Sequence, residues 1–211
     1  MRLVAVLFAA LIFAVPANAG ELHVAVLSPV EDVSLPFFCD WGYDWDERCY
    51  RDDSARLALG GEPGKVWRSA LRFSLGPIPA GATVVTAELS LWYDRTCVGP
   101  RKTGRSCDGS AFELEAHRIL TPRWFAEREV EIDPVAYLAA LDPFAPPQWL
   151  TWDVTELVAE WQAGELPNYG LLIELAADQE AYELPGPLLP SSSFPDPTIR
   201  PRLTVWYLPQ G

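Results

Sequence analysis

The segment of residues 148–173 limits the possible folds of this chain more than any other segment does. Residues 148–153, with the sequence Gln-Trp-Leu-Thr-Trp-Asp, read as a strand. Helical spacing of apolar side chains follows over residues 154–163, and Gly164 then stops the helix. A second apolar strand closes the segment at residues 168–173. The pattern predicts two strands joined by one short helix.

The predicted helix has a start signal and one apolar face. Asp153 stands three residues before Glu156, the spacing of a capping box in which each side chain satisfies a free backbone N–H. The side chains expected on one face of this helix are Val154, Leu157, Val158 and Trp161. We therefore expect this face to pack on a sheet.

Most of the remaining chain has the sequence pattern of β-strands. Residues 84–94 alternate most clearly, with Val85, Ala87, Leu89, Leu91 and Tyr93 on one face. Further strands are expected at residues 23–30, 71–75, 112–116 and 202–207. Residues 130–145 fit either a strand or a brief helix, and residues 185–201, with six prolines and three serines, are expected to form a long surface loop. The fold class predicted is all-β: an antiparallel jelly-roll β-sandwich with one short helix near 154–163.

The first nineteen residues have the pattern of a signal peptide. Arg2 supplies a positive start, residues 3–15 are apolar, and residues 17–19 form an Ala-Asn-Ala cleavage site before Gly20. The apolar run is too short to span a bilayer. We expect residues 1–19 to be removed and residues 20–211 to form a single exported domain, secreted or periplasmic, with no membrane insertion.

The charge of the chain excludes some partners. The formal net charge is −13, and it becomes −14 without the leader, which carries one Arg and no acid. Nucleic acids and anionic membrane surfaces are bound through basic patches. Neither is expected as a partner.

Four cysteines in an exported chain predict disulfides. Three connectivities are open, and the sequence favours Cys39–Cys49 and Cys97–Cys107, because each pair closes a short loop between strand-like segments. A zinc site is the alternative for cysteines, but the close Cys-x-x-Cys spacing of zinc ribbons and fingers is absent.

Several short segments resemble the DNRLRE-domain family, which overlaps carbohydrate-binding module family 96. The matching pieces are residues 68–75, 78–84 and 87–93, Trp124 with Glu127, residues 152–155 with Trp161, residues 168–173 and residues 200–205. The resemblance implies a jelly-roll β-sandwich of secreted proteins, some relatives of which bind acidic polysaccharides. It implies a non-catalytic module that recognises extracellular carbohydrate.

A carbohydrate site has candidates in the sequence. Trp92 and Trp206 are out of phase with the inward-facing residues of their strands, so they could stack on sugar rings unless loops or the helix cover them. A basic island begins at Arg95 and continues with Arg101, Lys102 and Arg105, whose cations could pair with carboxylates of a glycan. The same loop could instead be solvated, or pack on the acidic segment between Cys39 and Cys49.

That acidic segment is also a candidate calcium loop, since Asp44, Asp46 and Glu47 offer the hard oxygen ligands that calcium prefers. No other cofactor is expected. A solvated acidic loop is the alternative.

Nothing in the sequence assembles a catalytic group. His117 shares a strand face with Glu115, which is expected to be a surface pair, and no nucleophile-elbow motif accompanies it. The sequence therefore predicts a non-enzymatic binding module for carbohydrate. The alternatives are a structural or assembly component of the cell surface that binds protein rather than sugar, and, third, a polysaccharide-active enzyme.

Overall fold

The computed structural model describes residues 20–39, 55–62, 65–97, 105–106, 111–122, 130–142, 144–181 and 185–210. The predicted leader, residues 1–19, lies outside these ranges. Among the helices that are described, none has the length and apolar character needed to cross a membrane.

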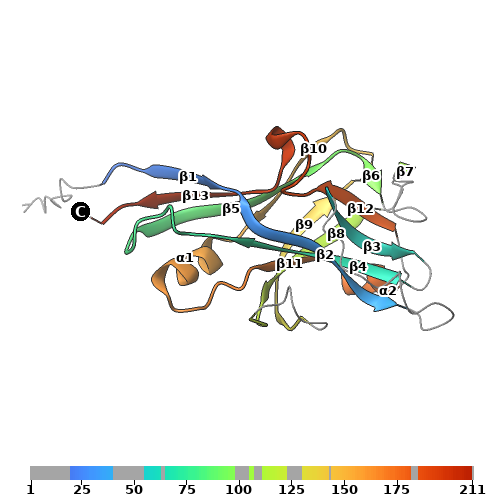
Figure 1. Ribbon diagram of the computed structural model, residues 1–211, viewed down its shortest axis with the longest axis horizontal. Helices are drawn as coiled ribbons and strands as arrows, with labels where there is room; N and C mark the ends of the chain where they lie inside the picture. Colours follow the sequence, from blue (N-terminus) through green and yellow to red (C-terminus); the bar gives the residue numbers. More distant parts are fainter. Residues whose placement is uncertain are drawn as a thin grey trace, which may run out of the picture.

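The smaller of two antiparallel sheets holds four strands in the order β1-β13-β5-β10. Its strands are β1 (His23–Leu27), β5 (Thr83–Tyr93), β10 (Gln148–Asp153) and β13 (Arg202–Leu208). Figure 1 shows β1, β13 and β5 side by side as the upper layer at one end of the molecule. β1 is therefore an edge strand, paired only with β13 among the described strands.

The larger sheet has the order β7-β6-β12-β3-β4-β11-β8-β9, and β2 pairs with β4 off this path. Its strands are β2 (Pro29–Cys39), β3 (Arg56–Glu62), β4 (Lys65–Phe73), β6 (Thr96–Cys97), β7 (Arg105–Ser106), β8 (Phe112–Ile119), β9 (Ile132–Leu141), β11 (Leu171–Leu175) and β12 (Pro185–Pro190). The two sheets confirm the predicted all-β antiparallel sandwich.

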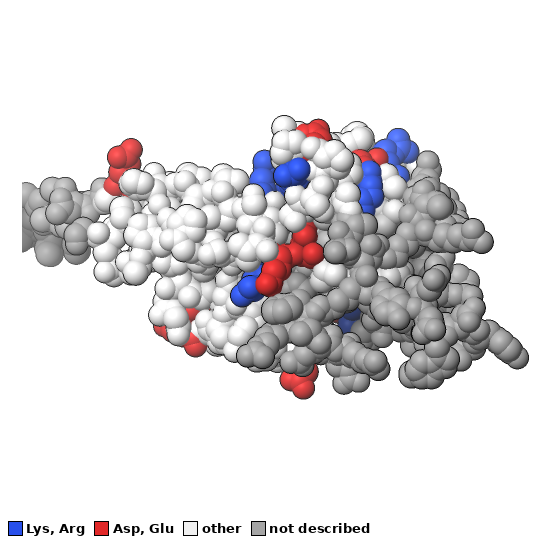
Figure 2. All heavy atoms as spheres, in the orientation of Figure 1, with Lys and Arg blue, Asp and Glu red and all other residues white. Residues whose placement is uncertain are grey.

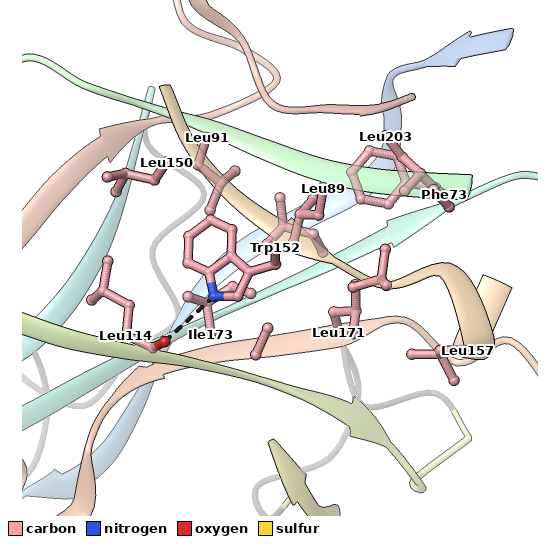
Figure 3. Close-up of a cluster of buried hydrophobic side chains, with 14 of the residues drawn as sticks. Phe73, Leu89, Leu91, Leu114, Leu150, Trp152, Leu157, Leu171, Ile173 and Leu203 are labelled. Atoms are coloured by element: carbon pink, nitrogen blue, oxygen red, sulfur yellow. Dashed lines mark hydrogen bonds between the residues drawn. The ribbon is translucent and has the colours of Figure 1, made fainter. Parts of the chain in front are cut away.

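The core lies between the inner faces of the two sheets. Trp152 of β10 is fully buried there, and its indole Nε1 donates a hydrogen bond to the carbonyl oxygen of Leu114 on β8, 3.4 Å away (Figure 3). Apolar side chains of both sheets surround it, including Leu89, Leu91, Leu150, Leu171, Ile173 and Leu203. Trp152 thus joins the two sheets through one side chain.

Helix α1 (Thr155–Ala163) confirms the predicted helix and its face. Leu157, Val158 and Trp161 are buried, and Gly164 ends the helix with a φ of 75°. The predicted capping box is wrong, because the N-cap is Val154 and no side chain caps the helix. Asp153 instead accepts from the backbone N–H of Thr155, at 3.0 Å, and from its hydroxyl.

One residue of the predicted apolar face of β5 is wrongly placed. Ala87, Leu89, Leu91 and Tyr93 are fully buried, but Val85 is 47% exposed. The pairing with β13 shifts here, since Trp206 lies opposite Thr86 whereas Tyr207 lies opposite Val84. This bulge changes the phase of the strand, so Val84 packs against the core in place of Val85.

Two other segments are now defined. Within residues 130–145, left open between helix and strand, β9 occupies Ile132–Leu141. Residues 185–201 are not a continuous loop, because β12 occupies Pro185–Pro190 and the short 3-10 helix η3 occupies Pro197–Ile199. A second short helix, α2 (Ala177–Ala181), was not foreseen.

Cys97 of β6 is disulfide-bonded. The side chains of the other three cysteines lie outside the described part of the structure. The pairings Cys39–Cys49 and Cys97–Cys107 therefore remain predictions.

Candidate functional site

Trp92 does lie on the outer face of the smaller sheet, as its phase predicted, but other side chains pack on it. Trp149 of β10 stands opposite Trp92, and their rings meet edge to face with centroids 5.3 Å apart. The guanidinium of Arg202 from β13 lies 3.9 Å from the Trp149 ring centroid, a cation–π contact. Trp92 is therefore part of a stack of three side chains from three neighbouring strands.

Sequence reasoning missed Trp149 and Arg202. Trp149 precedes inward-facing Leu150, so the alternation of β10 already placed it on the outer face. What the sequence did not contain was the register that brings Trp149 opposite Trp92.

Trp206 lies on the same outer face, but not beside Trp92. It stands opposite Thr86, six residues from Trp92 along β5. At about 3.3 Å per residue, roughly 20 Å separate the two positions along the strand. The two tryptophans do not form one site.

The predicted basic island is described only in part. Arg95 is exposed in the turn after β5, with a φ of 69° that is unusual for a residue other than glycine. Arg105 lies in β7 opposite Cys97, and its side chain is outside the described part of the structure. Arg101 and Lys102 also lie outside the described residues, so the grouping of these four cations is untested. The same is true of the predicted calcium ligands Asp44, Asp46 and Glu47.

An ion pair holds the turn from which the basic island starts. Arg56 Nη2 lies 2.7 Å from Asp94 Oδ2, and Arg56 Nη1 donates to the carbonyl oxygen of Leu188 at 3.0 Å. Burial alone would raise the pKa of the Asp94 carboxyl, but hydrogen bonds from Arg56 and Thr96 outweigh it and hold this pKa below its usual value. The turn is thus tied to both β3 and β12.

A row of exposed apolar side chains begins just before the edge strand β1 and runs along it. Leu22, Val24 and Val26 are 51%, 52% and 64% exposed. Val24 lies opposite outward-facing Trp206, and Val26 lies opposite Thr204, so the row borders β13 on the outer face. On the face that Figure 2 draws, no Lys or Arg covers the end of the molecule where β1 and β13 lie. We call Leu22, Val24, Val26 and Trp206 the apolar edge.

The apolar edge was not foreseen, although the sequence predicted a strand at residues 23–30. Alternation along residues 22–27 gives two faces, Val24 with Val26 and Ala25 with Leu27, and both are apolar. The pairing with β13 decides which of the two faces is buried, because it directs the side chain of Leu27 toward the core. Side-chain size gave no usable signal, because the two valines lie outward and the smaller Ala25 inward.

Glu115 and His117 share a strand face as predicted, but they are not a surface pair. Only 4% of His117 is exposed, and Glu174 of β11 lies directly opposite Glu115. A strand pattern fixes which residues share a face, but not whether that face is covered.

The fold and its surface define a two-sheet antiparallel module with an apolar edge. Comparison with known families gives a match to the TGF-beta propeptide family over residues 51–185, more than half of the chain. The chain belongs to the TGF-beta propeptide family. No curated protein matches the chain.

This membership corrects the predicted family and function. The resemblance to the DNRLRE domain and carbohydrate-binding module family 96 was wrong, and so was the carbohydrate-binding function derived from it. The quoted pieces include the fully buried Trp152 and Leu171 and nearly all of the inner face of β5. Any two-sheet sandwich needs apolar side chains at such positions to fill its core. The quoted pieces therefore indicated the fold class but gave no information on a ligand.

The coarser expectations agree with the family. TGF-beta propeptides are secreted and non-catalytic, which supports an exported chain that is not an enzyme. They act through protein contacts, which favours the alternative that the sequence left open, a structural or assembly component that binds protein.

Proposed function

We propose that this chain is an exported, non-catalytic module that binds another secreted protein through its apolar edge. The occupant proposed is an extended apolar segment of a partner with net positive charge. The observation that carries the proposal is the row formed by Val24 and Val26 on the edge strand β1 and by Leu22 just before it.

An exposed apolar edge strand is unusual in a protein that has no partner. Its free backbone N–H and C=O groups are a template for a further strand, and natural proteins commonly protect such edges with charges, prolines or bulges. β1 carries the sequence His-Val-Ala-Val-Leu, which contains no Lys, Glu, Asp or Pro. A partner strand added beside β1 would gain main-chain hydrogen bonds, and its alternate side chains could pack against the valines.

Charge supports the choice of a basic partner. The mature chain carries a formal charge near −14, so a basic protein would be attracted during its approach. The contact itself would be apolar, since the edge presents no charged side chain. Approach and specificity would then come from different parts of the surface.

The proposed contact is not transferred from the family. β1 and β13 lie outside the matched residues 51–185, whereas β5 and β10 of the same sheet lie within them. The family supports a protein partner, and the edge strand supports the place where that partner binds.

The matched control is β9, the edge strand at one end of the larger sheet. It also exposes apolar side chains, with Leu138 at 71% and Val135 at 62%. The pairing of β9 with β8 shifts between Ala136 and Ile132, so Val135 and Leu138 do not belong to one regularly alternating row. If any exposed apolar side chain were enough to bind the partner, residues of β1 and of β9 would give the same crosslinks.

The experiment is site-specific photo-crosslinking. A benzophenone amino acid replaces Val24, Val26 or Leu138, and each variant is exposed to the exported proteins of its own source. We expect a single adduct with a different protein at positions 24 and 26 and none at position 138. An adduct of twice the chain's own mass, the same adducts at all three positions, or no adduct at 24 and 26 would refute the proposal.

A further inference from the structure

Glu115, His117 and Glu174 form a buried cluster on the face of the larger sheet that points away from the core. Glu115 and His117 lie on β8, and Glu174 lies on β11 directly opposite Glu115. The side chains of His117 and Glu174 are only 6% and 8% exposed, and that of Glu115 is 25% exposed. Two carboxylates placed opposite each other on adjacent strands repel unless a positive group lies between them.

The three side chains converge on one point. His117 Nε2 lies 3.2 Å from Glu115 Oε2 and 3.4 Å from Glu174 Oε1. One ligand atom from each residue lies within 4.8 Å of the other two.

The hydrogen bond on the other side of the imidazole fixes its tautomer. His117 Nδ1 lies 2.8 Å from the carbonyl oxygen of Asp133. A carbonyl oxygen only accepts, so Nδ1 carries the proton, and in the neutral ring Nε2 presents a lone pair. In the neutral ring, Nε2 faces Oε2 of Glu115 and Oε1 of Glu174, and these three atoms form a donor set that could hold a cation between them.

The surroundings hold the ligand atoms in place. Arg68 Nε lies 2.7 Å from Glu174 Oε2, and Arg68 Nη2 lies 2.7 Å from Glu180 Oε2. The Nε and Nη2 groups of Arg68 donate to the carboxylate of Glu180 on α2, which balances the charge of Arg68. The Arg68 charge lies beside the far oxygen of Glu174, and Oε1 of Glu174 faces His117. Such outer contacts orient metal ligands in known sites.

We propose that Glu115, His117 and Glu174 bind a zinc ion. Zinc takes imidazole nitrogen and carboxylate oxygen at about 2.0–2.2 Å, and tetrahedral ligands at that distance lie about 3.3 Å apart. The 3.2 Å and 3.4 Å separations from His117 Nε2 fit this spacing. Calcium fits less well, because it takes six to eight oxygen ligands. Three protein ligands leave a fourth position for water or for a donor from another molecule.

The test uses the exported form of the chain without an affinity tag, stripped of metal with a chelator and titrated with zinc chloride by calorimetry near pH 7.5. We expect one zinc per chain, and at least tenfold weaker binding in His117→Gln and in Glu174→Gln. His23→Gln is the matched control, since His23 is the only other histidine and lies exposed on β1. Its affinity should equal that of the unmodified chain. Equal affinity in His117→Gln, or a loss in His23→Gln, would overturn the assignment.

A second measurement needs no variant, so it decides even where a substituted chain fails to fold. Nitrogen-15 NMR of the imidazoles in the unmodified chain should show zinc shifting the Nε2 resonance of His117 while the proton on Nδ1 stays. Cobalt(II) in place of zinc should give the strong visible absorption of a tetrahedral ion. An unshifted His117, or only the weak absorption of octahedral cobalt, contradicts the proposed site.

Discussion

Replacing Trp152 by alanine tests the arrangement of the two sheets most severely. Trp152 is fully buried and reaches from β10 to Leu114 on β8. Large-to-small changes of this kind cost the lost transfer free energy plus the cavity, about 3–5 kcal/mol for Trp to Ala. The unpaired Leu114 carbonyl adds little, because the hydrogen bond is long at 3.4 Å.

Trp149→Ala is the control from the same strand. Trp149 points to the opposite face, is half-buried, and contacts Trp92 and Arg202. Its loss removes one aromatic pair and one cation–π contact, together about 1–2 kcal/mol.

Urea denaturation followed by circular dichroism measures both variants. Because domains of ordinary stability unfold with about 5–15 kcal/mol, Trp152→Ala should shift the midpoint far below that of Trp149→Ala. Equal shifts, or a larger shift for Trp149→Ala, would mean that β10 presents its other face to the core and that the register with β5 is wrong.

Two further predictions concern the turn after β5 and the entry to β11. Asp94→Asn should destabilise the fold by about 1–2 kcal/mol at neutral pH, since it removes the charged acceptor of Arg56. The pKa of Asp94 is lowered in the fold, so this stabilisation is present above its ordinary pKa near 3.8 and is lost as the pH falls further. Thermal melts of the two chains should therefore converge below about pH 4. A constant gap between their melting temperatures would contradict the ion pair. Gly170→Ala should cost more than about 2 kcal/mol, because Gly170 has a φ of 102° and an added Cβ would collide with the carbonyl oxygen of Leu71. Gly164→Ala, at a φ of 75° with open space around it, should cost only about 1 kcal/mol of unfolding free energy. Calorimetric melts in which Gly164→Ala is the more destabilised of the two glycine variants would contradict this geometry.

Local patterns predicted the fold well where one physical effect dominated. The apolar face of α1 and its stop at Gly164 follow from helical spacing and from a left-handed C-terminal residue, and the structure has both. The alternation of β5 failed only at Val85, where a bulge changed the phase. A bulge depends on the partner strand, which the local pattern does not contain.

The proline-rich segment shows how tertiary burial overrides local propensity. Prolines at 185, 187 and 190 argued against a strand, since each lacks a donor for the ladder. β12 nevertheless pairs with β3 and β6, with a register shift between Pro185 and Leu188. Leu188 and Leu189 are almost fully buried, and their burial outweighs the missing donors.

The site was less predictable than the fold, because it depends on contacts between distant strands. Trp92 was placed on the correct face, but its partner Trp149 lies 57 positions along the chain and meets it only through the register of β5 and β10. Glu174 likewise joins Glu115 and His117 only through the pairing of β11 with β8. The family assignment failed because the quoted motifs were core positions that different sandwich families share.

The most direct test of the account is the affinity of the crosslinked partner for chains with an altered apolar edge. Val24 and Val26 are more than half exposed, so the double variant Val24→Lys/Val26→Lys should fold normally. If a partner strand buries both side chains, their loss removes about 3 kcal/mol of binding free energy, which is roughly a hundredfold in Kd. Leu138→Lys should change Kd by less than threefold. An unchanged Kd in the double variant, with Leu138→Lys behaving the same way, would show that the partner does not bind the β1 edge.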